Sequence, residues 1–379
     1  MQGSGFRAQG PVSSGFRVLI AGGGTGGHVI PALAIARELR DKQGADVRFV
    51  GTARGLETRL VPAAGFKLEL VRSGQLKNVS AATRLKTAVD VPMGVVECVR
   101  LLREFRPHVV VGVGGYASGP GMIAAILLRV PTLAYEPNAV PGMTNRWLGR
   151  WVSGAAVNFE QTAKYFRNAE VTGVPVRPEI FALAPRPAAA APRLLVTAGS
   201  NGARIFNETM PQIVVELLAT VPGLTIVHQA GVRQVETTRA AYVASGADPT
   251  RWRVEAFLED MPAQYGAADV VLARSGSTVA ELCAAGKPSL LVPFAAAADD
   301  HQRKNAEVLV QAGAAAMLLE IDATPAAVLA ELRGLLLDPH RRAVMSGKAR
   351  GLARVGALGK IAGMVLRLAR VERRAQPRS

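Results

Sequence analysis

The stretch FRVLIAGGGTGGHVIPALAIARELR, residues 16–40, contains the pattern from which the fold is predicted. It opens with an apolar run, Phe16–Ala21, which predicts a buried parallel strand. A glycine-rich segment follows, and we expect a helix from about Val29 to Arg40. Another apolar run at Val47–Val50 predicts the next strand. Alternation of strand and helix is typical of a parallel sheet that helices cover on both faces.

The same opening recurs roughly 180 residues further along the chain. Arg193–Ala198 (RLLVTA) resembles Phe16–Ala21, and the glycine-containing segment Gly199–Arg204 follows it as in the first case. Further strands are predicted at Val109–Val113, Thr132–Ala134, Thr225–Gln229, Val270–Ala273 and Ser289–Val292. A chain of 379 residues also exceeds what one hydrophobic core usually supports. The sequence therefore predicts an α/β protein with two doubly wound, Rossmann-like domains.

We expect the domain boundaries to follow from this repeat. Residues 1–15 are expected to be a disordered tail, 16–175 an N-terminal domain and 176–356 a C-terminal domain. The Pro- and Ala-rich stretch Pro175–Pro192 reads as the linker. A helix at about 357–370 is expected to pack back on the first domain, and 371–379 to form a basic tail. Ligands of open α/β sheets lie beyond the carboxyl ends of the strands, so two facing sheets would place two substrates in one cleft.

Composition excludes several classes of protein. Hydrophobic residues make up 49% and charged residues 20%, which is globular rather than disordered. The two cysteines, Cys98 and Cys283, are far apart, which excludes a disulfide framework and favours a reducing cytosol. The N-terminus has no apolar segment typical of a secretory signal. The charge-free run Val109–Leu128 is interrupted by glycines, so a strand, a turn and a helix are more consistent with it than a membrane span.

The net charge of +16 is concentrated near the C-terminus. Residues 341–379 hold eleven Lys and Arg residues against a single acid, Glu372. A basic tail suits a polyanionic partner, although a purely solubilising role remains open. Aromatic residues are only 5%, and no nucleic-acid-binding signature is visible, so no nucleic-acid partner is expected.

Three glycine-rich loops follow predicted strands. Gly22, Gly24 and Gly27 satisfy G-x-G-x-x-G, a pattern that brings backbone N–H groups against an oxyanion at the start of a helix. NAD is disfavoured, because no acid follows the second strand to hold a ribose. The loops Gly112–Gly121 and Gly199–Arg204 occupy equivalent positions. One loop alone could be a tight turn, but three favour several phosphates, as when a donor and an acceptor both carry a diphosphate.

His28 lies where the first loop becomes a helix. The positive end of the helix favours a neutral imidazole, which can take a proton from an attacking hydroxyl. A histidine that only hydrogen-bonds the loop is the alternative.

Five segments in order carry a resemblance to a known family. They are GGGTGGHVIPALA (22–34), GVGGYASGPG (112–121), TGVPVRPEI (172–180), GSNGARIFNETMP (199–211) and RSGSTVAELCAAGKPSLLVPF (274–294). Together they resemble the MurG family, the bacterial N-acetylglucosaminyltransferases of glycosyltransferase family 28. The resemblance runs from about Phe16 to Leu368.

The resemblance implies a GT-B enzyme without a cofactor. It would transfer GlcNAc from UDP-GlcNAc to the C4 hydroxyl of MurNAc in undecaprenyl-diphospho-MurNAc-pentapeptide (lipid I), with inversion, giving lipid II and UDP in peptidoglycan synthesis. The enzyme would be peripheral on the cytoplasmic face of the inner membrane. Its partners would be UDP-GlcNAc, lipid I and an anionic membrane surface.

The resemblance also assigns residues. His28 is the candidate catalytic base. Donor-binding residues implied are Thr25, Gly26, Gly27, Asn138, Arg177, Ser200, Leu258, Thr278, Glu281 and Gln302. Leu258 would meet the uracil through its backbone, and Glu281 would accept hydrogen bonds from the ribose hydroxyls. Acceptor or phosphate loops would include Gly24, Gly114, Gly115 and Tyr116.

The chain departs from the family pattern at a few positions. Tyr135-Glu136-Pro137-Asn138 stands where His-Glu-Gln-Asn is frequent, and Arg274–Thr278 is one residue shorter than usual. Val174 stands where Asn is usual, and Ala198 replaces a Gly. His28, Arg177, Glu281 and Gln302 are all retained.

A possible membrane face and a possible metal site complete the set of candidates. Residues 67–106 carry eight basic and four acidic residues among apolar side chains, which suits an anionic leaflet. The alternative is an ordinary helix packed on the sheet, since Pro92 would interrupt an amphipathic helix. Asp299-Asp300-His301 fits a helix N-cap better than a metal site, and no tightly bound metal is expected.

Two other functions stay open at this stage. The first is another GT-B enzyme, either a glycolipid glycosyltransferase or a UDP-GlcNAc 2-epimerase. The second is a nucleotide-regulated membrane-binding module without catalysis.

Overall fold

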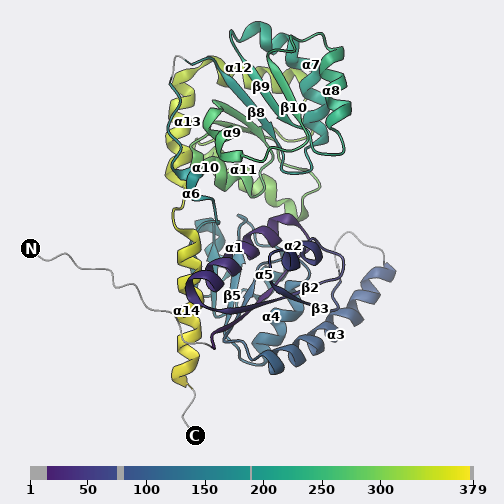
Figure 1. The fold of residues 1–379 in the computed structure, drawn as a ribbon, viewed down its shortest axis with the longest axis vertical. Helices are drawn as coiled ribbons and strands as arrows, with labels where there is room; N and C mark the ends of the chain where they lie inside the picture. The colour runs from purple at the N-terminus through teal and green to yellow at the C-terminus, as the bar shows by residue number, and fades with distance from the viewer. Residues whose placement is uncertain (1–14, 75–80, 188–189, 376–379) are drawn as a thin grey trace, which may run out of the picture. The chain divides into compact units, whose positions relative to one another are not determined.

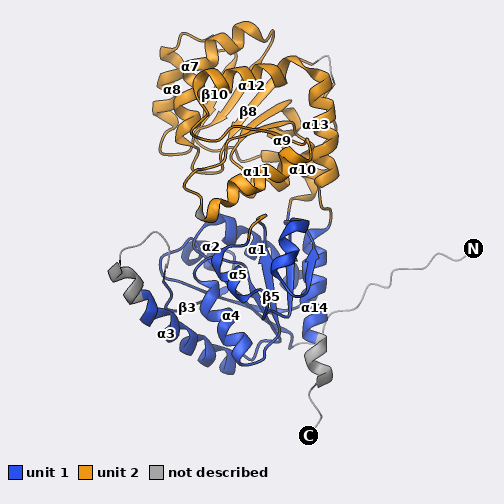
Figure 2. Ribbon diagram, turned by 180° about the vertical axis from the view of Figure 1, so that it is seen from behind, with its two compact units in different colours: residues 1–137, 141–175, 356–379 blue, residues 138–140, 176–355 orange. Residues whose placement is uncertain are grey.

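The structure, a computed structural model, describes residues 15–74, 81–187 and 190–375 (Figure 1). The predicted N-terminal tail lies outside these residues except for Gly15, as do the last four residues of the predicted basic tail. The chain divides into two compact units (Figure 2). Unit 1 comprises residues 1–137, 141–175 and 356–379, and unit 2 comprises residues 138–140 and 176–355.

Unit 1 contains a seven-stranded parallel sheet in the order β3-β2-β1-β4-β5-β6-β7. Its strands are β1 (Arg17–Ala21), β2 (Asp46–Gly51), β3 (Lys67–Leu70), β4 (Val109–Gly112), β5 (Thr132–Glu136), β6 (Gly154–Val157) and β7 (Ala169–Val171). In the central register Ile20 pairs with Phe49 on one side and Val111 on the other. The central strands are buried throughout because helices cover both faces.

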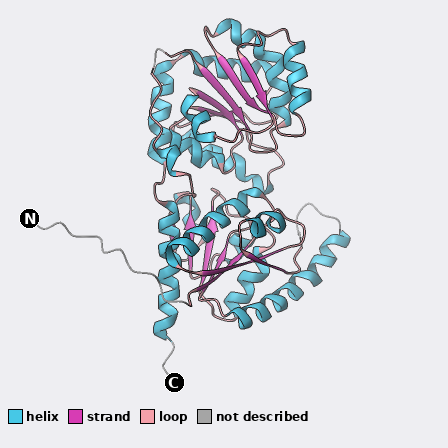
Figure 3. Cartoon of the chain, in the orientation of Figure 1, coloured by secondary structure: helices cyan, strands magenta, loops and turns pink. Residues whose placement is uncertain are grey.

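Helices lie on both faces of this sheet, as Figure 3 shows. They are α1 (Gly26–Gln43), α2 (Glu57–Ala63), α3 (Ala81–Phe105), α4 (Ser118–Leu127), α5 (Met143–Leu148), the 3-10 helix η1 (Glu160–Tyr165) and α14 (Ala357–Ala375). Val18 and Ile20 of β1 pack in a core with α1 and α14, whereas Leu19 and Ala21 pack in a second core with α3 and α4. This alternation is the two-residue period of a strand. The chain thus returns from unit 2 to complete unit 1 with its last helix.

Helix α3 runs without a break through Pro92. The expectation that this proline interrupts the helix is therefore wrong. A proline removes one backbone hydrogen bond and crowds the carbonyl four residues earlier. Both Pro92 and Ala88 are exposed, so that carbonyl can turn to water and the helix can continue.

Unit 2 contains a six-stranded parallel sheet in the order β10-β9-β8-β11-β12-β13. Its strands are β8 (Arg193–Thr197), β9 (Thr225–Gln229), β10 (Trp252–Glu255), β11 (Val270–Ala273), β12 (Ser289–Leu291) and β13 (Ala316–Met317). All strands predicted for both units are confirmed, with bounds that differ by at most two residues.

The helices of unit 2 also form two layers. They are α6 (Pro178–Phe181), α7 (Arg204–Thr220), α8 (Val235–Ala244), α9 (Met261–Ala267), α10 (Thr278–Ala285), η2 (Ala298–Asp300), α11 (His301–Gln311), α12 (Pro325–Leu337) and α13 (Pro339–Leu352). Side chains of α7, α8 and α12 share one core with β8, β9 and β11. Helix α10 packs against α6, α9 and α13.

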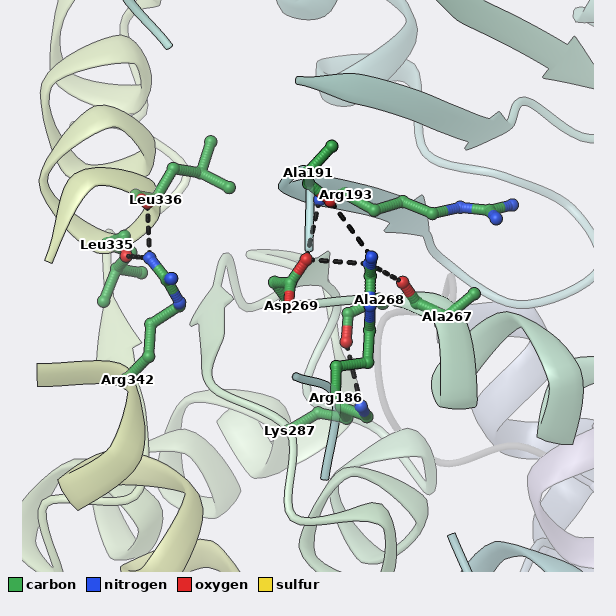
Figure 4. A network of polar contacts seen from close by, with 10 residues as sticks. All are labelled: Arg186, Ala191, Arg193, Ala267, Ala268, Asp269, Lys287, Leu335, Leu336 and Arg342. Atoms are coloured by element: carbon green, nitrogen blue, oxygen red, sulfur yellow. Dashed lines mark hydrogen bonds and ion pairs between the residues drawn. The ribbon is translucent and has the colours of Figure 1, made fainter. Parts of the chain in front are cut away.

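The amino ends of β8 and β11 are closed by a polar network, drawn in Figure 4. Asp269 Oδ2 accepts hydrogen bonds from the Arg193 N–H and from Arg186 Nη1, each 2.8 Å long. Nearby, the buried Lys287 donates to the Ala268 carbonyl at 2.8 Å, and burial lowers the pKa of this lysine to about 8. Arg186 belongs to the predicted linker. This part of the linker is therefore fixed to unit 2, at the amino ends of its strands.

Candidate functional site

The first glycine-rich loop of unit 1 is packed through its backbone against the second. A Cβ atom on Gly22 would lie closer than 3.0 Å to both Val113 Cγ2 and the Gly114 carbonyl oxygen. Gly24 has a φ of 92°, which L side chains rarely adopt. Only glycine therefore allows the chain to leave β1 here and enter α1.

His28 lies in the first turn of α1, half-buried. Its Nδ1 is 3.3 Å from Thr25 Oγ1. The ring lies against the second glycine-rich loop, where a Cβ atom on Gly114 would be 3.2 Å from Nε2 and one on Gly115 would be 3.4 Å from Nδ1. Both glycines have positive φ values, 87° and 78°. The predicted base and the predicted loop residues Gly24, Gly114 and Gly115 thus lie together at the carboxyl ends of β1 and β4.

Two serines hold the second loop in place. Ser118 Oγ donates to the Gly115 carbonyl at 3.0 Å, and Ser73 Oγ donates to the Tyr116 carbonyl at 2.7 Å. Tyr116 itself is exposed, as are Thr25 and Gly27 of the first loop. The first-turn N–H groups of any α-helix lack intrahelical acceptors, so those of Gly26 and Gly27 can receive an anion.

In unit 2 the third loop turns from β8 into α7. Gly199 and Gly202 have positive φ values of 71° and 68°. A Cβ atom on Gly202 would lie closer than 3.0 Å to the Ala230 carbonyl oxygen, so the loop rests on the segment that follows β9. Ser200 is exposed at its tip.

Gln229, the last residue of β9, connects the third glycine-rich loop to Leu258, a predicted donor-binding residue. It is buried, its Nε2 donates to the Gly199 carbonyl at 2.6 Å, and its Oε1 accepts the Leu258 N–H at 3.3 Å. Sequence reasoning did not select Gln229. Its position could have indicated a functional role, because it is a polar residue at the carboxyl end of a predicted buried strand.

Glu281 of α10 lies between two partners. Its Oε2 accepts the Tyr265 hydroxyl at 2.9 Å, and its Oε1 lies 3.8 Å from Arg177 Nη2. Burial raises the pKa of Glu281, while the Tyr265 hydrogen bond and the Arg177 charge act in the opposite direction. The predicted residues Arg177 and Glu281 are thus brought together, and Tyr265, fully buried on α9, is a partner that the sequence did not reveal. Thr278, the other predicted residue of this helix, begins α10.

Gln302 and Asn138 are both held by contacts around α11. The Gln302 Oε1 accepts the Phe294 N–H at 3.0 Å. One turn along, the buried Asn305 donates to Asn138 Oδ1 at 3.1 Å and accepts the Ala139 N–H at 2.8 Å. These bonds attach the segment 138–140 to unit 2, although it lies in the sequence between two elements of unit 1. Asn305 is not among the residues predicted from the sequence.

Arg274 organises the loop that follows β12, despite the shortened segment to which it belongs. It donates to the Val292 and Pro293 carbonyls at 3.0 Å and to Glu320 at 2.6 Å. The second oxygen of Glu320 accepts the Ala295 N–H at 2.7 Å. The loop that leads to Gln302 is therefore fixed by one ion pair and its hydrogen bonds.

The Asp299-Asp300-His301 segment does precede a helix, as predicted. Asp300 is the N-cap residue of α11, but its side chain makes no capping bond and instead pairs with Arg303 at 2.6 Å. Within residues 15–74, 81–187 and 190–375, no group of three or more His, Cys, Asp or Glu residues is placed to hold a metal ion.

Comparison with known proteins gives the family. The profile of the glycosyltransferase family 28 N-terminal domain matches residues 18–157, and that of the C-terminal domain matches residues 193–357. A protein of Anaeromyxobacter sp. (strain Fw109-5) is 44% identical over 360 residues, 93% of this chain and 94% of the relative. It is named UDP-N-acetylglucosamine--N-acetylmuramyl-(pentapeptide) pyrophosphoryl-undecaprenol N-acetylglucosamine transferase.

Solved structures agree with this result. The crystal structure of MurG from Acinetobacter baumannii matches with a TM-score of 0.78 at 32% identity, covering 93% of this chain and 99% of that one. This match confirms the predicted GT-B fold. A UDP-N-acetylglucosamine 2-epimerase structure matches with a TM-score of 0.62 at 15% identity, covering 97% of this chain and 99% of that one. At that identity the likeness shows the fold alone.

Proposed function

Because this chain belongs to glycosyltransferase family 28, we propose that it is a hexosyltransferase that moves GlcNAc from UDP-GlcNAc to lipid I, forming lipid II and UDP. The observation that carries the proposal is the 44% identity over 93% of the chain to a relative named for this transfer. The acceptor would be the C4 hydroxyl of MurNAc on undecaprenyl diphosphate, with inversion at the anomeric carbon.

We assign the donor to unit 2. Glu281 would accept hydrogen bonds from the two ribose hydroxyls, and its carboxylate is contacted by Tyr265 and Arg177. Gln229 contacts the Leu258 backbone, which would meet the uracil, and the Gly199 loop, which would receive the diphosphate together with Ser200. The cationic Arg177 would stabilise the charge that builds up as UDP departs.

We assign the proton transfer to His28 of unit 1. The acceptor hydroxyl oxygen bonds to the anomeric carbon while the bond from that carbon to the phosphate oxygen breaks. The hydroxyl proton passes to the imidazole, and UDP leaves with the bonding electron pair. General base catalysis of this kind contributes roughly a hundred- to ten-thousandfold in rate. The Gly26 and Gly27 N–H groups would bind an oxyanion of either substrate.

A transfer assay tests this proposal. The full chain is incubated with radiolabelled UDP-GlcNAc and a short-chain analogue of lipid I, and labelled disaccharide lipid is expected. No labelled lipid would contradict the proposal. Conversion of UDP-GlcNAc to its 2-epimer without acceptor would favour the alternative epimerase function, with which the chain shares its fold.

We further propose that unit 1 binds the cytoplasmic surface of the membrane. None of the helices in the described ranges is both long and apolar enough to span a bilayer. On α3, Val89, Met93 and Val96 are exposed, while Cys98 and Leu102 are buried against the sheet. The helix therefore packs on the sheet and still presents an apolar strip outward.

A second feature on the same side of the sheet supports membrane binding. Trp147 and Trp151 are 65% and 70% exposed. They line a surface hollow of about 770 Å³ together with Arg146, Arg150, Lys164, Tyr165, Phe166 and Arg167. Phe166 packs in the same core as α3, which places the hollow on that side. Tryptophan beside Lys and Arg suits the interface of an anionic leaflet, where each charge contributes about 1 kcal/mol.

Vesicle sedimentation tests the membrane surface. We expect the full chain to bind phosphatidylglycerol-containing vesicles better than pure phosphatidylcholine vesicles, and a Trp147→Ser/Trp151→Ser variant to lose most of that binding. The matched control is Val243→Ser, at an equally exposed apolar position on unit 2. Equal binding by the double variant and the parent would contradict this assignment.

A further inference from the structure

Glu57 is a fully buried carboxylate beside the first glycine-rich loop. It begins α2 and is 0% exposed. Among the residues that the structure describes, no ion pair to Glu57 is found. A buried charge without a cation is costly unless hydrogen bonds compensate it.

Three hydrogen bonds supply that compensation. Glu57 Oε2 accepts the Gly24 N–H at 2.7 Å. Oε1 accepts both the N–H and the hydroxyl of Thr52, each at 3.0 Å. Gly24 also accepts a hydrogen bond from this segment, since the Leu56 N–H donates to the Gly24 carbonyl at 3.2 Å. Both peptide groups of Gly24 are therefore fixed by residues 56 and 57.

The space around the carboxylate is made by glycines. A Cβ atom on Gly23, Gly51 or Gly55 would lie closer than 3.0 Å to a side-chain atom of Glu57. None of these three glycines has a positive φ. Backbone conformation therefore does not explain why a side chain is missing there, whereas the room needed by the Glu57 carboxylate does.

We propose that Glu57 is a positioning residue for His28, acting through Gly24 and Thr25. Gly24 precedes Thr25, whose carbonyl accepts the His28 N–H at 3.1 Å and whose hydroxyl lies 3.3 Å from the His28 ring. The carboxylate fixes the start of this chain of contacts, and Gly114 and Gly115 fix the ring from the other side. Because the Gly24 N–H already binds a carboxylate, Gly24 shapes the loop rather than binding a substrate phosphate. This inference rests on the proposed role of His28 as base.

Glu57→Gln tests the inference at nearly constant volume. The Gly24 and Thr52 N–H groups bond different oxygens of the carboxylate, and a glutamine in the same orientation has its NH₂ group, which cannot accept, in place of one of them. We expect kcat to fall about tenfold or more while the KM for UDP-GlcNAc stays within about twofold, because misplacement of a catalytic group costs turnover. Glu104→Gln, at an exposed position of α3, is the matched control for the change in charge and should leave both constants unchanged.

A second measurement needs no substrate. The chain has five histidines, so the ring nitrogen–proton correlations of His28 can be assigned by comparison with His28→Gln. Glu57→Gln should move the His28 signals and leave those of the buried His228 in place. Unchanged His28 signals together with an unchanged kcat would overturn the inference. Failure of the transfer assay with moved His28 signals would instead count against the proposed function alone.

Gly23→Ala covers the case in which Glu57→Gln does not fold. This substitution retains the negative charge of Glu57. The new methyl group would lie too close to the carboxylate and should displace it from the Gly24 N–H. We expect the same loss of kcat and the same movement of the His28 signals. In a variant that already carries Glu57→Ala, the new methyl group meets no carboxylate. Adding Gly23→Ala to that variant should therefore change neither kcat nor the His28 signals any further. A folded Gly23→Ala variant with parental kcat and parental His28 signals would also overturn the inference.

Discussion

The candidate functional groups of unit 1 and unit 2 differ in kind. In unit 1 the surface around His28 is backbone, formed by two glycine-rich loops that approach each other and the imidazole closely. In unit 2 several candidate groups, namely Glu281, Asn138 and Gln302, are side chains, and each accepts a hydrogen bond from another element. We therefore expect the function of unit 1 to depend mainly on the shape of its backbone, and that of unit 2 mainly on charge and acceptor geometry. Substitutions in the two units should therefore change different kinetic constants.

The largest effect should come from removing His28, the proposed base in unit 1. We expect His28→Ala to lower kcat by about a hundred- to a thousandfold, since general base catalysis is lost. Affinity for UDP, measured by calorimetry, should remain within about twofold of the parent. Parental turnover in this variant would remove His28 as the base.

The same chemical change in two glycine-rich loops separates the units further. Gly115→Ala and Gly202→Ala each place a Cβ atom on a residue with positive φ and closer than 3.0 Å to a carbonyl oxygen. We expect Gly115→Ala to lower kcat by about tenfold or more, and Gly202→Ala to raise the KM for UDP-GlcNAc by a similar factor. Steady-state kinetics with both substrates varied would reveal the split. A rise in the KM for UDP-GlcNAc in both variants would contradict the proposed difference between the two units.

A smaller and pH-dependent effect is expected from Tyr265→Phe in unit 2. Burial raises the pKa of Glu281, and the Tyr265 hydroxyl lowers it, so removal of that hydroxyl should raise the pKa further. A protonated carboxyl has lost acceptor capacity for the ribose, so UDP binding should be lost at a higher pH than in the parent as the solution is acidified. We expect about a three- to tenfold weaker UDP affinity near neutral pH.

Calorimetry of UDP binding across the acid range measures this shift. Tyr242→Phe is the matched control, because Tyr242 is equally buried in unit 2 but contacts His228 instead. An unchanged pH midpoint for Tyr265→Phe would show that the hydroxyl does not tune Glu281.

The smallest effect on catalysis should come from Lys287, which lies at the amino ends of the unit 2 strands, away from the candidate site at their carboxyl ends. Burial lowers its pKa from 10.5 to about 8, so between these values the unfolded chain binds more protons than the folded one. This residue alone should raise the free energy of unfolding with pH across that window, by at most about 3 kcal/mol. In Lys287→Met that contribution should vanish, while the donor KM stays parental.

Denaturant titrations at several pH values would compare the two proteins. Other groups titrate equally in both, so their contribution cancels in the difference. A difference in stability that does not vary between pH 8 and 10.5 would contradict the assignment of the lowered pKa to Lys287.

Much of the fold follows from the sequence because the central strands are continuous apolar runs. The strands β3, β6, β7, β10 and β13 were not predicted, since they are short and either contain charged residues, as in KLEL and WRVE, or small ones, as in GAAV. Local pattern also cannot give the order of strands in a sheet, which depends on long-range pairing.

The candidate site residues could likewise be predicted only where a local sequence pattern marks them. The glycine-rich loops, His28, Arg177 and Glu281 could be selected because they form recognisable motifs. Glu57, Gln229, Tyr265 and Asn305 could not, because what distinguishes each of them is a hydrogen bond to a residue on another element. Gln229 and Gly199 are thirty residues apart, and Glu57 and Gly24 are thirty-three apart. Such roles appear only once the chain has folded.

A crystal structure of the full chain with bound UDP-GlcNAc tests the division between the two units most directly. We expect uracil beside the Leu258 backbone, ribose hydroxyls on Glu281 and the diphosphate at Ser200, all in unit 2. Uridine bound instead to the glycine-rich loops around His28 in unit 1 would contradict it.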